Sequence, residues 1–152
     1  MKGQVMENPL QAFKALVTDL EHAAGNIAQK YELENLTGPQ GKVLYYLYKH
    51  QEDAIFIKDI EQKLHISKSV ASNLVKRMAK NGYIHLETSE NDKRYKRLRL
   101  TDEGISKIEP LERFHQELFS QLFVGITPED GQVVEKVLHQ LTQNLKNYKE
   151  NK

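Results

Sequence analysis

The sequence contains no cysteine, and this absence excludes several kinds of site at once. Without thiols the chain can form neither disulfides nor thiolate metal sites, and it cannot sense redox conditions through a thiol. No apolar run approaches the ~20 residues that span a bilayer, and the N-terminus lacks the apolar core of a signal peptide. We therefore expect a cytoplasmic protein without a membrane partner.

The residue constellations that carry catalysis are also missing. No nucleophile stands beside a base, no glycine-rich loop is placed to hold phosphate, and no pair of carboxylates shares a helical face. Glu112 and His115 are three residues apart and Glu135 and His139 are four apart, spacings at which two side chains can reach one metal ion. Neither pair has a third ligand nearby, so surface pairs on amphipathic helices are the simpler interpretation. The sequence predicts no enzyme, no metal site and no cofactor.

Positive charge is concentrated in one stretch of the chain. The 152 residues carry a net charge of only +1, yet residues 58–99 hold eleven Lys or Arg against five Asp or Glu. This stretch therefore has a local charge of about +6, and the remainder is correspondingly acidic. Such asymmetry predicts one basic working surface rather than a uniformly charged protein.

Residues 57–80 have the pattern of two helices joined by a short turn. Ile60 and Leu64 form an apolar stripe on the first helix, and the chain is expected to turn at His65 and Ile66. Ser67 follows, with a hydroxyl that can cap the second helix. The second helix is amphipathic, and the residues predicted to face the core are Val70, Ala71, Leu74, Val75 and Met78.

The polar side of this second helix suits the major groove of DNA. Hydroxyl groups bind phosphates and base edges, an amide pairs with adenine, and cations pair with guanine or phosphate. A solvated helix face is the alternative, and it would be preferred if the helix stood alone. The residues predicted to contact DNA here are Ser67, Lys68, Ser69, Ser72, Asn73, Lys76 and Arg77.

A hairpin with basic residues follows the second helix. Residues 83–87 and 98–100 alternate as strands do, and residues 89–92 have turn chemistry. Five of the seven residues from 93 to 99 are Lys or Arg, a density that the structure of a hairpin does not require. A recognition helix followed by such a hairpin indicates a winged helix-turn-helix. The basic wing residues predicted to contact DNA are Lys93, Arg94, Lys96 and Arg97.

Three longer helical patterns lie outside the winged helix-turn-helix. They begin at Asn8, at Thr101 and at Thr127, each with a capping side chain and an apolar stripe. Pro110 falls inside the middle pattern, which predicts a bend or a lost hydrogen bond. Gly25, inside the first pattern, can mark a close helix crossing. A small DNA-binding module does not provide enough apolar surface to bury these stripes. Two chains are therefore expected to cover them in a homodimer.

The expected fold is mainly α-helical with a small β wing. A helix at residues 40–50 precedes the helix-turn-helix, and residues 54–56 can add a short strand beside the wing. The winged helix-turn-helix DNA-binding domain then covers residues 35–100. The helical dimerisation region comprises residues 1–34 and 101–152.

This order of elements resembles the MarR family of transcription regulators over roughly residues 8–148. The most specific part resembles the family's wing signature, here Asp92, Lys93, Arg94, Leu98, Leu100, Thr101 and Gly104. The resemblance implies that Arg94 reaches the DNA minor groove and that Asp92 helps to hold the wing. The sequence departs from the family pattern at Phe56, where Thr or Ser usually caps the helix, and at His65, where Gly is common.

Residues and resemblance together predict a homodimeric, sequence-specific DNA-binding transcriptional regulator, a ligand-responsive repressor of a pseudo-palindromic operator. The recognition helix would read the major groove and the basic wing the minor groove. The alternative is a winged-helix protein-interaction module without sequence-specific DNA binding. The wing cations favour double-stranded DNA as the partner, because phosphates require clustered positive charge and a protein partner does not.

The MarR resemblance also implies a small aromatic or anionic effector. In that family effectors occupy a pocket where the DNA-binding and dimerisation helices meet. The residues expected at this junction are Leu16, Leu20, His22, Tyr45, Tyr48 and Arg113. Aromatic walls with one or two cations suit a flat anion such as a phenolic acid. The alternative is that these side chains simply fill the junction.

Overall fold

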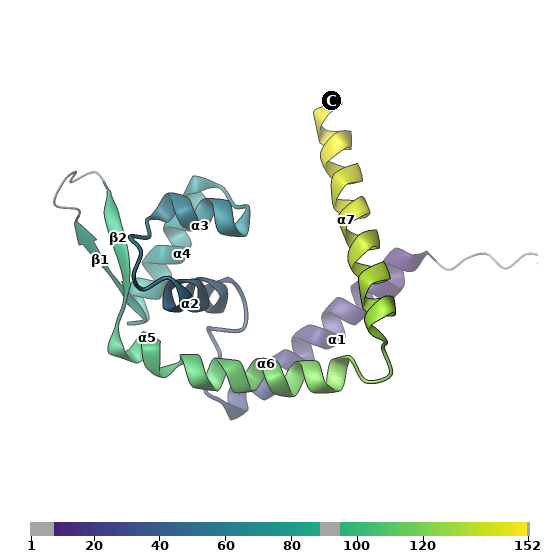
Figure 1. Ribbon diagram of the computed structural model, residues 1–152, viewed down its shortest axis with the longest axis horizontal. Coiled ribbons are helices and arrows are strands. Elements are labelled where there is room, and N and C mark those ends of the chain that lie inside the picture. The colour runs from purple at the N-terminus through teal and green to yellow at the C-terminus, as the bar shows by residue number, and fades with distance from the viewer. Residues whose placement is uncertain (1–7, 89–94, 152) are drawn as a thin grey trace, which may run out of the picture. The chain divides into compact units, whose positions relative to one another are not determined.

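The helix-turn-helix lies beside the hairpin in the computed structural model of the chain (Figure 1), and buried apolar side chains of both form one hydrophobic core. The structure describes residues 8–88 and 95–151. The elements are α1 (Pro9–Lys30), α2 (Pro39–Lys49), α3 (Ile57–Leu64), α4 (Lys68–Lys80), β1 (Ile84–Thr88), β2 (Lys96–Leu100), α5 (Asp102–Ser106), α6 (Ile108–Leu122) and α7 (Pro128–Glu150). The predicted fold class, mainly α with a small β wing, is confirmed.

The core joins elements that are distant in the sequence. Ile60 of α3, Leu74 of α4, Leu98 of β2 and Leu111 of α6 are each at most 3% exposed. Each large apolar side chain buried in this way contributes about 1.5–3 kcal/mol. The hairpin pairs antiparallel, with Leu86 opposite Leu98, so its apolar side chains lie on the face that packs against the helices. The core therefore fixes the hairpin and α4 against each other.

A third β segment beside the hairpin is shorter than predicted. Residues 54–56 do not form a strand; Phe56 makes a single antiparallel bridge with Arg97. The backbone N–H of Leu98 donates to the carbonyl oxygen of Ile55 at 2.8 Å, which ties the segment to β2. The chain enters α3 immediately afterwards, and this leaves no length for further pairing.

The helical pattern after the wing is broken into two helices rather than bent at Pro110. Thr101 caps α5 as predicted, because its Oγ1 atom accepts from the N–H of Gly104 at 3.0 Å. Helix α5 ends at Ser106 and α6 begins at Ile108, with Lys107 between them. Pro110 therefore lies in the first turn of α6, where no intrahelical N–H is needed.

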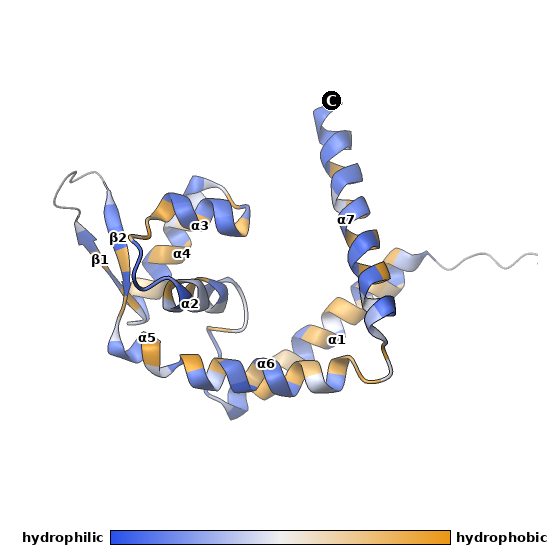
Figure 2. Cartoon of the chain, viewed as in Figure 1, coloured by the Kyte–Doolittle hydropathy of each residue, from blue (hydrophilic) through white to orange (hydrophobic). Residues whose placement is uncertain are grey.

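Helix α7 begins at the predicted cap but leaves its apolar stripe exposed. The Oγ1 atom of Thr127 accepts from the N–H of Asp130 at 3.1 Å, and Asp130 accepts in return from the N–H of Thr127. No residue of α7 is buried. Figure 2 shows the apolar positions interspersed along the helix. The exposed large apolar residues are Val133, Val134, Val137, Leu138, Leu141, Leu145 and Tyr148.

Helix α1 likewise leaves much of its apolar surface uncovered. Asn8 caps the helix by accepting from the N–H of Leu10 at 3.0 Å, as predicted. Ala28 is buried near the C-terminal end, whereas Leu10, Phe13 and Leu16 are 46–51% exposed. A side chain at the position of Gly25 would meet nothing within 4 Å, so Gly25 marks no close crossing within this chain.

The chain divides into two units, one ending at Leu118 and the other beginning at Phe119. The first unit holds the winged helix-turn-helix, and the second holds α7. Among the described residues, no helix combines the length and the apolar character needed to cross a membrane.

Candidate nucleic-acid interface

The turn between α3 and α4 is built without glycine. His65 adopts the left-handed conformation, with φ 54° and ψ 48°, in the position where the family commonly has Gly. Such a conformation costs a non-glycine residue roughly 1–2 kcal/mol. The N–H of Ile66 donates to the carbonyl oxygen of Glu61 at 3.1 Å, which closes the end of α3. Ser67 then caps α4 by accepting from the N–H of Val70 at 3.2 Å.

The start of α3 is capped from inside the helix rather than by Phe56. The Oδ2 atom of Asp59 accepts from the backbone N–H of Phe56 at 2.8 Å. This bond is the half of a capping box in which the side chain of the third helical residue satisfies the backbone N–H of the N-cap residue. The N–H of Asp59, which an N-cap Ser or Thr side chain would accept from, donates instead to the carbonyl oxygen of Phe56 at 3.0 Å. Phe56 is therefore compatible with the helix start, and its ring is available for packing against Tyr95, whose ring centroid lies 6.1 Å away.

The outer surface of α4 carries the side chains that were predicted to contact DNA. Lys68, Ser69, Asn73, Lys76 and Arg77 are exposed, and Ser67 is exposed at the cap. Ser72 is half-buried. On the opposite side of the helix the buried residues are Ala71, Leu74, Val75 and Met78. Hydroxyl, amide and cationic groups thus stand together on one outer surface.

Val70 was predicted to face the core, and this prediction is wrong. Its side chain is 49% exposed, whereas Ala71 beside it is fully buried. At about 100° per residue Val70 falls at the edge of the buried arc of α4, on the first turn of the helix. The apolar residue type alone could not reveal which side of that edge it occupies.

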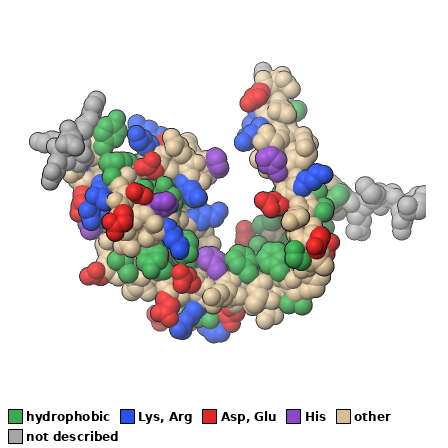
Figure 3. Space-filling model, viewed as in Figure 1, with side chains coloured by type: hydrophobic (Ala, Val, Ile, Leu, Met, Phe, Trp, Pro, Cys, Tyr) green, Lys and Arg blue, Asp and Glu red, His purple; other side chains and the backbone are tan. Residues whose placement is uncertain are grey.

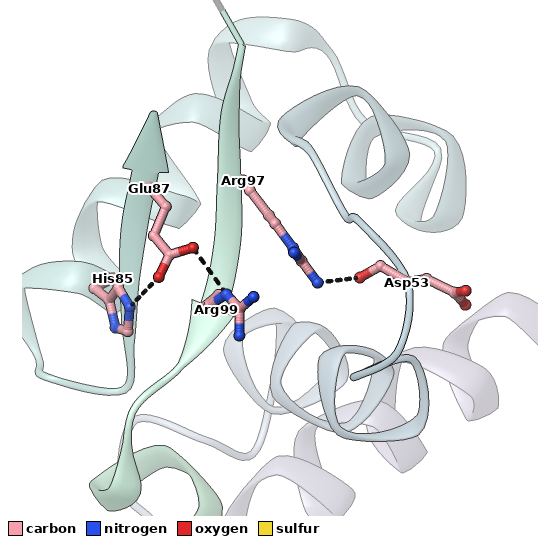
Figure 4. Close-up of polar contacts among 5 residues, drawn as sticks. All are labelled: Asp53, His85, Glu87, Arg97 and Arg99. Carbon is pink, nitrogen blue, oxygen red and sulfur yellow. Dashed lines mark hydrogen bonds and ion pairs between the residues drawn. The ribbon is translucent and has the colours of Figure 1, made fainter. Parts of the chain in front are cut away.

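The cations at the base of the wing are held in different ways (Figure 4). Arg99 donates through Nε to the carboxylate of Glu87 at 2.8 Å, and His85 contacts the same carboxylate at 3.3 Å. These partners, His85 first and then Arg99, hold the pKa of Glu87 below its usual value. Arg97 points to the other side, where its Nη2 atom donates to the carbonyl oxygen of Asp53 at 3.2 Å. Lys96 is exposed.

The wing is also connected to α3 through aromatic contacts at its base. Tyr95 is 48% exposed, and its ring meets Phe56 edge to face. The ammonium group of Lys58 lies 5.9 Å from the centre of the Tyr95 ring. The predicted DNA-contacting residues Asp92, Lys93 and Arg94 lie outside the described residues. Figure 3 shows Lys and Arg side chains on the surface of the helix-turn-helix and hairpin.

The six residues predicted to hold an effector lie on α1, α2 and α6. Leu16 and His22 are exposed on α1 and Leu20 is half-buried there; Tyr45 and Tyr48 lie on α2 with ring centroids 6.5 Å apart. Arg113, on α6, lines a cavity of ≈ 500 Å³. Sequence reasoning missed the other residues of this cavity, which are Lys30, Tyr31, Glu32, Ser106, Glu109 and Pro110.

His115 lies on α6, close to the aromatic ring of Phe114. The two ring centroids are 5.3 Å apart, and partial burial lowers the pKa of His115 below its ordinary value of 6.5. Within the described ranges, no group of three or more His, Cys, Asp or Glu side chains is arranged to hold a metal ion. The lowered pKa favours the neutral imidazole, which is the ligating form of histidine.

These elements define a winged helix-turn-helix protein, and comparisons with known proteins identify its family. A model of the MarR family matches residues 34–94. The uncharacterized HTH-type transcriptional regulator YfiV of Bacillus subtilis (strain 168) is 30% identical over 82% of this chain and 76% of its own. The chain belongs to the MarR family and is a DNA-binding regulator of transcription.

A solved structure shows a higher identity. The heme sensor protein PefR from Streptococcus agalactiae, in complex with heme, is 48% identical over 91% of this chain and 95% of its own, with a TM-score of 0.77. Heme-free PefR is 47% identical over 90% of this chain and 99% of its own, with a TM-score of 0.81. The architecture described above is therefore shared with a protein that senses heme.

Proposed function

We propose that the protein is a homodimeric repressor that binds a pseudo-palindromic operator and releases it in response to heme. DNA binding is supported by the outer surface of α4. Hydroxyl, amide and cationic side chains lie together there, on a helix whose opposite face is buried in the core. That helix follows a tight turn at His65 and is capped by Ser67. In this proposal α4 reads the major groove and the wing reaches the minor groove.

The proposed dimer is supported by the uncovered apolar stripes. Helix α7 has no buried residue in the single chain, although seven of its large apolar side chains are 40–65% exposed. Surfaces of this kind are rarely left in water by a stable monomer. A second chain would cover them, and a twofold dimer would present two copies of α4 to two half-sites of the operator.

Truncation tests the dimer directly. A chain ending at Thr127 lacks α7, so we expect it to lose the dimer and to aggregate through the remaining apolar surface. A chain lacking residues 1–30 should behave in the same way. Light scattering coupled to size exclusion measures both. A soluble, well-folded monomer from either truncation would contradict the assignment of residues 1–34 and 101–152 to dimerisation.

Heme as the effector is supported by the identity of 47–48% to PefR and by side chains of this chain. A side chain of this chain would have to hold the heme iron, and with no cysteine in the sequence a histidine would be the natural choice. His115 suits the role because its ring centroid lies 5.3 Å from that of Phe114 and because its lowered pKa favours the neutral imidazole. His50 and His85 contact the carboxylates of Asp53 and Glu87.

Heme is both aromatic and anionic, so it falls within the effector class expected from the sequence, although it is larger than a phenolic acid. When bound, heme would supply an iron centre that a side chain of the protein can coordinate. The residues of this chain would supply the imidazole of His115, which is exposed on α6 beside the ring of Phe114. The effect on DNA requires that heme binds better to the dimer geometry that does not fit the operator.

Absorption spectroscopy tests the heme proposal. Addition of hemin to the parent protein should produce a saturable Soret band, and His115→Ala should weaken or shift it. His50→Ala is the matched control, because His50 is engaged with Asp53 at 3.2 Å and should not be needed. A Soret titration that is identical in the parent and in His115→Ala would remove His115 from the proposal. Salicylate in the same assay tests the phenolic-acid alternative.

Selection of bound sequences from random duplexes tests the operator proposal. A palindromic consensus would support both the dimer and sequence-specific reading. A gel shift on the selected duplex, with and without hemin, then measures the response to the effector. Equal binding to all duplexes would instead favour the interaction-module alternative, in which the winged helix serves a protein partner.

A further inference from the structure

Val70 places an apolar side chain on the exposed part of the first turn of α4. It is 49% exposed, whereas Ala71 and Leu74 of the same helix are at most 2% exposed. The position of Val70 is well fixed, because its backbone N–H donates to the Oγ atom of Ser67 at 3.2 Å. The cap that starts the helix therefore also sets where this side chain stands.

The exposed neighbours of Val70 on α4 are polar. Ser69 precedes it, Asn73 follows one turn later and Arg77 two turns later, and all three are exposed. A half-exposed valine gains no hydrogen bond from water, and covering its methyl groups would be favourable. A partner that offers polar groups to its neighbours and an apolar group to Val70 would fit the whole surface.

Duplex DNA offers one such apolar group in the major groove, the C5-methyl group of thymine. Residues at the N-terminal end of a recognition helix are the ones that reach base edges. We propose that Val70 is a specificity-determining residue that contacts the C5-methyl group of a thymine in each operator half-site. Its side chain has neither donor nor acceptor, so it cannot add a hydrogen bond to adenine, guanine or cytosine.

The inference rests on the sequence-specific DNA binding proposed above, and uracil provides a test that separates the two. Each thymine of the selected operator is replaced in turn by deoxyuridine, which removes the C5-methyl group and keeps the base pair. The parent should lose affinity about fourfold at one thymine of each half-site, the equivalent of ~0.8 kcal/mol for one methyl-sized group. Fluorescence anisotropy at fixed salt measures the dissociation constants.

Val70→Ala, tested on the same thymine and uracil operators, completes a double-mutant cycle between the side chain and the base. This variant should bind the thymine and uracil operators equally at the sensitive position, because the contacting methyl groups are gone. Val70→Thr keeps one methyl group and should retain part of the difference. Gln51→Ala is the control, since Gln51 is exposed in the turn after α2, outside both α4 and the proposed dimerisation region. It should keep the full thymine preference of the parent.

The outcomes distinguish the inference from the proposed function. A parent that binds the operator no better than unrelated duplexes overturns sequence-specific reading and the role of Val70 together. A parent that prefers the operator but tolerates uracil at every thymine overturns the role of Val70 alone. The role of Val70 is also overturned if Val70→Ala, with its unfolding midpoint unchanged, still distinguishes thymine from uracil as the parent does.

Discussion

The guanidinium group of Arg97 donates to the backbone carbonyl oxygen of Asp53, although the two residues are 44 positions apart in the sequence. The Nε atom of Arg97 is buried and has no hydrogen-bond partner among the described residues. Arg97 also forms the backbone bridge with Phe56, immediately before α3. This wing residue therefore connects β2 to the segment that leads into the helix-turn-helix.

Arg97→Ala should lower the free energy of unfolding by about 1 kcal/mol, because it removes a charge-assisted hydrogen bond and the packing of the aliphatic stem. Urea denaturation followed by circular dichroism measures this change. Lys96→Ala is the matched control: Lys96 is exposed on the same strand and should leave stability within about ±0.5 kcal/mol. If Lys96 contacts a phosphate, its loss should reduce the salt slope of DNA binding by about 1.

Arg94→Ala should weaken operator binding and leave both the dimer and its stability nearly unchanged. The prediction follows from the family's wing signature, in which this arginine reaches the minor groove. Substitutions away from packing features usually change stability by less than about 0.5 kcal/mol. Operator affinity equal to that of the parent, measured by gel shift, would contradict the assignment of Arg94.

Gly104→Ala should destabilise the fold by about 1–3 kcal/mol through overpacking. A Cβ atom at this position would collide with the carbonyl oxygen of Tyr83 and touch the side chain of Leu100. Gly131→Ala is the matched helical control, because a Cβ atom there meets nothing within 4 Å. It should leave stability unchanged or raise it by up to ~1 kcal/mol. Equal unfolding midpoints for both variants would contradict the close approach at Gly104.

Glu87 should make stability depend on pH in the acidic range. Its pKa is lowered in the folded state from an ordinary value of 4.5, so the unfolded chain binds this proton more readily. The resulting stabilisation is fully present above pH 4.5 and is lost as the pH falls through the lowered pKa. Glu87→Gln should flatten this part of the profile. The change should be small, because the side chain is 45% exposed. Urea denaturation at a series of pH values measures it.

Local signals in the sequence were sufficient for the helix starts and for the winged architecture. Asn8, Ser67, Thr101 and Thr127 cap the helices at which they were predicted, because a cap depends on a side chain and the backbone within three residues of it. Alternating apolar residues likewise located the hairpin, since strand periodicity is a property of the chain itself.

Other features depend on what packs against each element, and only the tertiary structure decided them. Val70 is as apolar as Val75, yet one is 49% exposed and the other is buried, because the core reaches only part of the first turn of α4. Arg97 belongs to the basic run of the wing, yet its partner is a carbonyl group 44 residues away. The sequence by itself determined the caps, the helical periods and the local charge. Exposure and long-range partners were decided by the fold, because they depend on segments that local patterns do not specify.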